Sequence, residues 1–520
     1  MNNNQHATSL HSRRQFLATT GAALAAAALP AGRAFAQQPA KYHRLNLMDA
    51  KAKKMLDSYQ IAIKAMLKLP PSDPHNWYRN AFVHTLDCPH GNWWFLPWHR
   101  GFIGWFEQTC RKLSGDPDFA LPYWDWTALP RIPDSFFQGV LNPEDPAFIA
   151  SLAAFEQQLK KPMSDLWKSF SPAQLQQLTA RGFNSVDAVW SAVEADPMFF
   201  PLAKARSLTQ AAPNFDAATR KAVSLPTLKA ALRPTNFVSF GSGIVAQHSG
   251  SASQGILESQ PHNLVHNDIG GFMGDFLSPV DPIFFMHHSN IERLWDVWTR
   301  KQKALNLPTL PTDPKELANW KKEPFLFYIG PDGKSIAKNT AGDYATIGDF
   351  DYDYQPGSGE QPPAKPSVFS DKHWLATMQA KSANARHIAQ AEVALPEALP
   401  AAAMEEEGPS LFARVTLKPG TDTKGVQFNV LVNPPADATQ VGFDDPSFAG
   451  TFSVFGQRAA AHADEPTTFT VSIAEAVARL QTAKRLNPTD KLQVHVVATR
   501  KGIALGQVDL NVAEISVGAH

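Results

Sequence analysis

The chain contains 520 residues, of which 44% are apolar and 18% charged, a composition typical of a globular protein of two or three domains. Its 48 basic residues balance 48 acidic ones, so net charge gives no attraction to nucleic acid or to an anionic membrane surface. Two cysteines exclude a disulfide framework and Cys-rich zinc or iron–sulfur sites. Metal binding would therefore rely on carboxylates and on the 17 histidines.

Residues 1–36 resemble a twin-arginine export signal. Arg13 and Arg14 precede an Ala-rich apolar stretch, and Ala34-Phe35-Ala36 supplies small residues for cleavage. A membrane anchor is the alternative, but the stretch is shorter than the roughly 20 residues that span a bilayer. We therefore expect a periplasmic or secreted protein without membrane or nucleic-acid partners. The sequence leaves the oligomeric state open.

Residues 37–354 are rich in Trp and Phe and show helical periodicity. Apolar residues spaced three to five apart predict an amphipathic helix over 45–68. Asp281-Pro282 predicts the start of another helix, since Asp caps free amides and Pro has no amide to leave unpaired. Arg100 and Glu107 are predicted to pair on a helix that follows His99.

The chain changes character after residue 354. Residues 355–409 are rich in Pro, Gly and Ala and are predicted to form a linker. Over 410–520 the apolar period becomes two, which predicts a small β-sandwich or barrel. We expect strands over 411–417, 426–432, 448–455, 468–473, 492–498 and 503–512, and a short helix over 473–481.

Six histidines form two triplets among aromatic residues. His262 and His266 are four residues apart, so on a helix they share one face, and His288 follows 22 residues after His266. The earlier triplet is His84, His90 and His99. Any one of these side chains could be a hydrogen-bonded core residue, but six buried imidazoles need partners, and metal ligation supplies them.

Three neutral imidazoles per ion suit zinc, copper, iron or nickel. A zinc peptidase would need Glu directly after the first His of the His262/His266 pair. Asn263 occupies that position, so the sequence lacks the general base of such an enzyme.

The flanking segments resemble those of tyrosinases and polyphenol (catechol) oxidases, the type-three copper family. The resemblance rests on Phe95-Leu96-Pro97-Trp98-His99-Arg100, on Leu121 to Trp126, on the His262/His266 pair, on Asp281 to Trp298 and on the motif Tyr352-Asp353-Tyr354. It implies a mainly α catalytic domain with a four-helix-bundle dicopper core, followed by a small all-β domain. That β-domain would resemble the shielding domain of latent plant enzymes.

The resemblance further implies that His84, His90 and His99 bind copper A, and that His262, His266 and His288 bind copper B. His287 would then be a hydrogen-bonding neighbour of the site. Only five residues separate His84 from His90, fewer than in relatives, so His75 is the alternative first ligand.

Cys88 lies two residues before His90 and four after His84. Both spacings resemble those of family cysteines that are joined to a ligand histidine through a thioether, here His90. The alternatives are a free buried thiol and a disulfide with Cys110.

Three further residues match functional positions of the family. Glu258 and Asn263 resemble the pair that holds and activates a water during monophenol turnover, although a helix-terminal acid and a surface amide would also occur there. Phe276 resembles a gate over copper B, or is a core aromatic.

The resemblance implies an enzyme that uses O2 at two copper ions to ortho-hydroxylate monophenols and to oxidise o-diphenols to o-quinones. Its substrates would be small phenols such as tyrosine, DOPA and catechols, with quinones that lead to melanin. The C-terminal domain would keep it latent, as in a zymogen. The alternatives are a catechol oxidase without monophenol activity, a hemocyanin-like oxygen-binding protein and a mononuclear zinc hydrolase.

Overall fold

The computed structural model places Tyr42–His520 in one compact unit. It describes residues 40–194, 205–360, 374–379, 381–382, 388–393, 411–419, 421, 423, 425–438, 441–455, 465–487, 491–500, 508 and 510–519. The predicted export signal, residues 1–36, lies outside the described residues. Among those described, no helix has the length and apolar character that crossing a bilayer requires.

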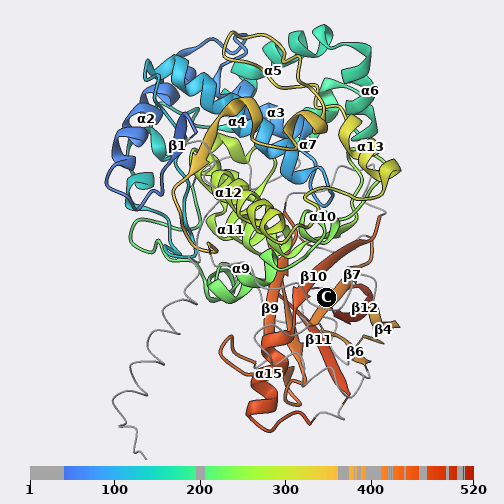
Figure 1. Ribbon diagram of the computed structural model, residues 1–520. Coiled ribbons are helices and arrows are strands. Elements are labelled where there is room, and N and C mark those ends of the chain that lie inside the picture. The colour runs from blue at the N-terminus through green and yellow to red at the C-terminus, as the bar shows by residue number, and fades with distance from the viewer. Residues whose placement is uncertain are drawn as a thin grey trace, which may run out of the picture. The chain divides into compact units, whose positions relative to one another are not determined.

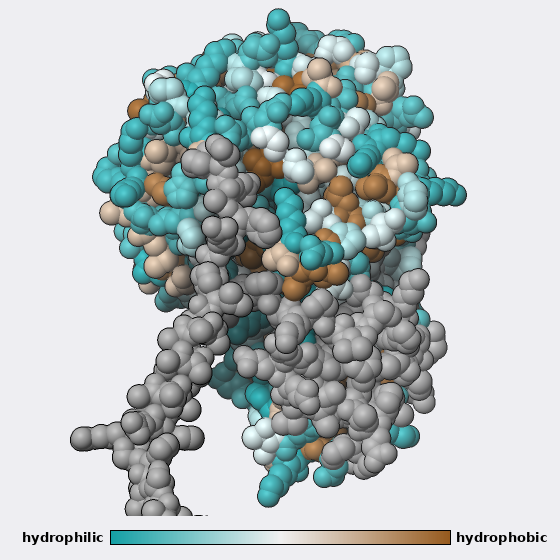
Figure 2. Space-filling model, in the orientation of Figure 1, coloured by the Kyte–Doolittle hydropathy of each residue, from teal (hydrophilic) through white to brown (hydrophobic). Residues whose placement is uncertain are grey.

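The part from Tyr42 to Tyr354 is mainly helical, as predicted (Figure 1). Its α-helices are α2 (Ala52–Lys68), α3 (Trp77–Asp87), α4 (Phe95–Ser114), α5 (Leu152–Ser169), α6 (Pro172–Ala180), α7 (Val186–Glu194), α8 (Ala217–Ala222), α9 (Leu225–Leu232), α10 (Phe237–Phe240), α11 (Asn263–Ile269), α12 (Ile283–Ala304) and α13 (Pro314–Lys322). Helices α2 and α12 both pack on α4, which is buried along most of its length. The face in Figure 2 is mostly hydrophilic over this part, as expected where the apolar residues fill a core.

Two predicted helix starts differ from the structure in detail. Helix α2 begins at Ala52 rather than at residue 45, because the backbone groups of Leu45 and Leu47 are hydrogen-bonded to Tyr123 instead of to helical neighbours. Asp281 does lie at the start of α12, where its carboxylate accepts a hydrogen bond from the Ile283 amide. It also forms a buried ion pair with Arg206, at 2.6 Å.

The predicted pairing of Arg100 with Glu107 is wrong. Arg100 donates to Glu292 of α12 at 2.7 Å, while Glu107 accepts from Arg44 at 2.8 Å. Residues seven positions apart lie on the same face of a helix, but they are about 10.5 Å apart along its axis, too far for direct pairing when nearer partners are present. Each of these two side chains finds a buried opposite charge on another element, and Tyr354 also hydrogen-bonds Glu292.

These ionic contacts join the two ends of the helical part. Strand β1 (Tyr42–Arg44) pairs in parallel with β3 (Tyr352–Tyr354), and Arg44 lies opposite Tyr354 in the register. The Arg44 guanidinium also lies 3.5 Å from the centroid of the Tyr352 ring. The motif at 352–354 thus closes the helical part on its first residues.

The C-terminal part is built from two five-stranded sheets, with strand orders β2-β10-β7-β12-β4 and β5-β6-β11-β8-β9. The strands are β2 (Ser253–Gln254), β4 (Trp374–Gln379), β5 (Lys381–Ser382), β6 (Ile388–Val393), β7 (Leu411–Leu417), β8 (Val426–Val432), β9 (Phe448–Ser453), β10 (Thr467–Ser472), β11 (Leu492–Arg500) and β12 (Val512–Ala519), with helix α15 (Ala474–Thr482) between β10 and β11. The all-β architecture is confirmed. We call residues 374–520 the β-domain.

One expectation for this region is wrong, and another cannot be compared with the described residues over most of its length. The predicted linker 355–409 is too long, because β4 and β6 lie inside it and pair with β12 and β11. The strand predicted over 503–512 falls mostly outside the described residues, and the last described strand, β12, begins at Val512. Buried Ile515 and Val517 then pair with β7 and fill the core between the sheets.

Strand β2 belongs to the helical part in sequence but to the β-domain in its pairing. Ser253 and Gln254 lie opposite Thr468 and Phe469 of β10 in parallel register. The pair of residues extends the β-domain sheet at its edge, only four positions before Glu258. The docking of the β-domain is therefore connected directly to the segment that carries His262.

Candidate dinuclear metal centre

The first histidine triplet is assembled by two helices and the turn between them. His84 lies in α3, His99 in the first turns of α4, and His90 in the turn that joins them. Their ring centroids are 5.3 to 5.6 Å apart. Gly91 makes the turn possible, because it has a φ of +75° and an added Cβ would lie 2.7 Å from the Ser251 hydroxyl.

The second triplet lies on α11, α12 and the turn that precedes α11. His262 ends a π-helical turn, Glu258–His262, of a kind that is frequent at functional sites. His266 follows in α11 and His288 in α12. The His262 and His266 ring centroids are 4.6 Å apart, so the spacing of four residues does place both on one face.

The two triplets face each other across the helices. The rings of His99 and His288 stack with centroids 4.1 Å apart and planes at 11°. The His90 and His262 centroids are 5.4 Å apart. Helices α3, α4, α11 and α12, with the turns before α4 and α11, therefore supply one continuous set of imidazoles, in the four-helix core that we expected.

Hydrogen bonds fix the orientation of four of these rings. The Nδ1 atoms of His84, His99 and His266 donate to backbone carbonyls at 2.6 to 2.7 Å, those of Phe276, Phe95 and Met273. The Nδ1 of His262 donates to the Asn263 side-chain oxygen at 2.8 Å. Each ring therefore carries its proton on Nδ1 and keeps the lone pair of Nε2 for a ligand.

Burial keeps the imidazoles neutral. It lowers the pKa of His84 and of His262 to about 3, and it lowers the pKa values of His90, His99, His266 and His288 as well. Neutral imidazole is the form that binds transition metals.

This donor set fits a pair of metal ions. The Nε2 atoms of His84 and His262 are buried without a hydrogen-bond partner, and those of His266 and His288 lie 3.1 Å apart. Lone pairs brought together in an apolar site are costly unless a cation lies among them. The ligand atoms of His84, Cys88, His90 and His99, and those of His262, His266, His287 and His288, form two groups with all atoms within 4.8 Å of one another.

The comparisons with known proteins agree with this geometry. Residues 39–301, half of the chain, match the common central domain of tyrosinase. The chain belongs to the tyrosinase family. Members of this family hold a dinuclear copper site, and the two imidazole groups of this chain are of a kind that could bind its metal ions.

Two curated relatives resemble the chain over this region. A chloroplastic polyphenol oxidase of Spinacia oleracea is 29% identical over 303 residues, which are 52% of this chain and 41% of the spinach protein. Tyrosinase HcTyr1 of Hahella sp. is 27% identical over 281 residues, 47% of this chain and 50% of that protein. The matched region thus spans half or less of each relative.

A solved structure shares the fold over nearly the whole chain. Latent aurone synthase, a polyphenol oxidase, has a TM-score of 0.58 at 21% identity and covers 93% of this chain and 90% of its own. The shared fold includes the β-domain.

Cys88 lies against the first triplet of this tyrosinase-family site. Its sulfur is 3.4 Å from Nδ1 and 3.7 Å from Nε2 of His90, so it faces the ring carbon that joins these two nitrogens. It also lies 3.4 Å from Nε2 of His99. Both cysteines are free and buried, so the structure contains no Cys88–Cys110 disulfide.

Glu258 and Asn263 are both buried, but no hydrogen bond joins them within the described part of the chain. The Glu258 carboxylate accepts from the Gly91 amide at 2.6 Å and from the Ser242 hydroxyl at 2.5 Å. Burial raises the pKa of Glu258 to about 7, against these two hydrogen bonds. Asn263 is bound instead to Gln254 and to the backbone of Ser453.

Two phenylalanines line the site from opposite parts of the chain. Phe276 was expected over the second triplet, but its ring lies near His84 and His90 of the first, with centroids 6.0 and 5.5 Å away. Phe455 comes from the β-domain, and its ring centroid lies 4.8 Å from that of His90 and 4.2 Å from that of His266. The sequence analysis did not identify Phe455 as a site residue, and its only signal was its place at the end of the strand predicted over 448–455.

His287 and His75 differ in their relation to the site. His287 lies beside the second triplet, with its ring centroid 5.4 Å from that of His262. His75, the alternative first ligand, donates from Nε2 to the Gly330 carbonyl at 2.8 Å and is not among the clustered ligand atoms of the described residues.

Proposed function

We propose that this chain is a latent phenol oxidase that hydroxylates monophenols and oxidises o-diphenols to o-quinones. The observation that carries the proposal is the pair of facing imidazole groups with their Nε2 lone pairs turned inward. We assign His84, His90 and His99 to one copper ion and His262, His266 and His288 to the other. Cys88 would be joined to His90 by a thioether, which fixes that ring. The thiol S–H and one ring C–H bond are lost when this bond forms, and O2, the co-substrate of the proposed reaction, would take up the two electrons and two protons as hydrogen peroxide.

Two copper ions in this set, when bound, would supply O2 binding and two-electron chemistry. One monophenol and one O2 give one o-quinone and one water, and two o-diphenols and one O2 give two o-quinones and two waters. The protein positions the ligand rings and excludes bulk water. Phe276 and the aromatic residues around the histidines provide an apolar surface against which a planar phenol ring packs.

Monophenol hydroxylation requires loss of the phenol proton, whose pKa is near 10. Glu258 and Asn263 lie on either side of the segment that carries His262, and we assign them to hold the water that accepts this proton. The raised pKa of Glu258, about 7, allows its carboxyl group to exchange a proton near neutral pH.

The position of the Phe455 ring supports the proposal that the enzyme is latent. Its buried ring contacts members of both triplets, in the space that a substrate ring would need. The same occlusion favours the alternative of an oxygen-binding protein, because O2 is far smaller than a phenol. Localisation in the periplasm or outside the cell remains our proposal from the export signal.

The test compares the full-length protein with Phe455→Ala, using Val454→Ala as the matched control. Both variants truncate one side chain beside β9, but only the first removes the ring from the histidines. We expect two copper ions per chain in all three proteins, and a rise in turnover of both catechol and tyrosine in Phe455→Ala alone. Catechol turnover without tyrosine turnover in every form would reduce the function to catechol oxidation. Reversible O2 binding without any turnover would identify an oxygen-binding protein.

A further inference from the structure

The Asn263 side chain has used both of its N–H donors. Its Nδ2 donates to the Gln254 side-chain oxygen at 2.9 Å and to the Ser453 carbonyl at 2.6 Å. Its oxygen accepts from the Nδ1 of His262. An asparagine amide has two N–H donors in total, so in this structure Asn263 has none left to donate to a water molecule.

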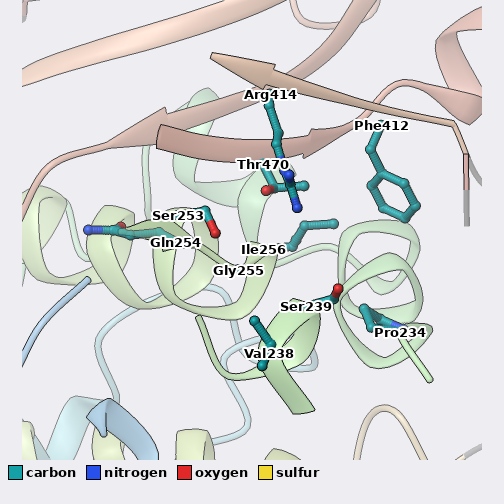
Figure 3. Close-up of a pocket in the computed structure, with 10 residues that line it drawn as sticks. All are labelled: Pro234, Val238, Ser239, Ser253, Gln254, Gly255, Ile256, Phe412, Arg414 and Thr470. Atoms are coloured by element: carbon teal, nitrogen blue, oxygen red, sulfur yellow. The ribbon is translucent and has the colours of Figure 1, made fainter. Parts of the chain in front are cut away.

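Both acceptors are placed by the β-domain. Ser453 ends strand β9, and Gln254 lies in β2, where it stands opposite Phe469 of β10. Figure 3 shows Ser253 to Ile256 lying beneath the strands that carry Arg414 and Thr470.

Asn267 holds the same stretch of β9 against α11. Its side-chain amide donates to the Ser453 hydroxyl at 3.0 Å and to the Val454 carbonyl at 2.9 Å. These contacts orient the Ser453 carbonyl toward Asn263, one helical turn away, and place Phe455 immediately beyond them. Two different features of the site are therefore controlled by three consecutive residues of the β-domain.

We propose that the docked β-domain suppresses monophenol hydroxylation in a second way, independent of the Phe455 ring. Phe455 limits access for every substrate, whereas Gln254 and the Ser453 carbonyl occupy the amide that the proposed function assigns to the proton-accepting water. Gln254 is then a specificity-determining residue that acts through Asn263. The inference rests on the proposed function and adds a separate control of the ratio between the two activities.

The inference predicts that two substitutions which open the site have different effects on the two activities. Removing Phe455 alone admits both substrates but leaves the Asn263 amide saturated, so diphenol oxidation rises far more than monophenol hydroxylation. Removing the Gln254 oxygen as well frees one N–H of Asn263 while β9 keeps its place. One hydrogen bond to a water corresponds to a change of about three- to tenfold in the monophenol-to-diphenol ratio of kcat.

The experiment uses the full-length, copper-loaded protein in three forms: Phe455→Ala, Phe455→Ala with Gln254→Ala, and Phe455→Ala with Gln254→Glu. The Glu variant keeps an oxygen acceptor for Asn263 and is the matched control. We expect the ratio of kcat for tyrosine to kcat for DOPA to rise only with Gln254→Ala, at equal copper content in all three.

Each of the other outcomes shows whether the inference or the proposed function is wrong. Equal, substantial ratios in all three forms would overturn the inference and leave the proposed function intact. Oxidation of DOPA without hydroxylation of tyrosine in all three would overturn the monophenol part of the proposed function, and this inference with it. A ratio that rises equally with Glu and Ala would show that Gln254 acts through packing rather than through its oxygen, which also overturns the inference.

Discussion

The imidazole rings of His99 and His288 stack in parallel, 4.1 Å apart, although one belongs to α4 and the other to α12. This contact brings the two histidine triplets into a single buried site. It exists because α4 and α12 pack against each other through buried aromatic residues, such as Phe106 and Phe285, whose rings also stack. The same packing that builds the core therefore sets the distance between the two metal positions.

Replacement of one ligand should remove one copper ion. For His262→Ala we expect one copper per chain instead of two, because the second triplet loses one of its three imidazoles. His75→Ala is the control, since His75 bonds Gly330 outside the cluster and should keep both ions. Metal analysis of the folded, dialysed proteins measures this. Loss of a copper ion from His75→Ala would instead support His75 as a ligand.

The proposed thioether between Cys88 and His90 should leave one thiol in the protein that is purified with copper bound and then unfolded. Alkylation followed by peptide mass analysis should label Cys110 and recover Cys88 in a peptide that has lost two hydrogen atoms. Cys88→Ser should still yield a labelled Cys110 and an unmodified His90 peptide. Labelling of both cysteines in the native sequence would contradict the cross-link.

Glu258 should make stability depend on pH in the copper-free protein. Its pKa rises from 4.5 to about 7 on folding, so between these values the folded chain keeps a proton that the unfolded chain has lost. The free energy of unfolding should therefore fall as pH rises through this window, by up to about 3 kcal/mol from this one group. Thermal unfolding of the native protein and of Glu258→Gln, each at pH 5 and pH 7.5, measures how the free energy of unfolding changes with pH in the two proteins. An equal change in the two proteins would show that Glu258 does not titrate between these pH values.

The buried ionic network should be far more important for stability than any surface pair. Glu292→Gln leaves the buried guanidinium of Arg100 without its carboxylate partner, so we expect unfolding to become easier by about 3–5 kcal/mol. Asp165→Asn breaks an exposed pair with Lys161 and should cost less than about 1 kcal/mol. Denaturant unfolding measures both, and a similar small loss for the two variants would contradict this ranking.

The sequence was sufficient to locate the six clustered histidines, because each lies in a motif that also fixes its helix or turn. It predicted β7 and β8 to the residue for a similar reason, since alternation of apolar residues is a local property. The strands at 374–379 and 388–393 were missed because they are short and separated by Pro- and Ala-rich stretches. Their pairing with β12 and β11 depends on residues more than a hundred positions away.

The partners of Arg100 and Glu107 and the position of Phe455 could not be predicted for a related reason. A charged side chain selects its partner from all elements packed around it, and here those are β1 and α12 rather than its own helix. Phe455 reaches the histidines only because β2 joins the β-domain sheet and Asn267 holds the end of β9. These contacts join segments that are far apart in the sequence, so no local sequence pattern predicts them.

Oxygen uptake by the copper-loaded Phe455→Ala protein in the presence of catechol, measured with its copper content, tests the central claim most directly. We expect two copper ions per chain and one O2 consumed for every two catechols converted to o-quinone. Two copper ions with reversible oxygen binding and no quinone, or a site that takes up a single zinc ion, would contradict the account.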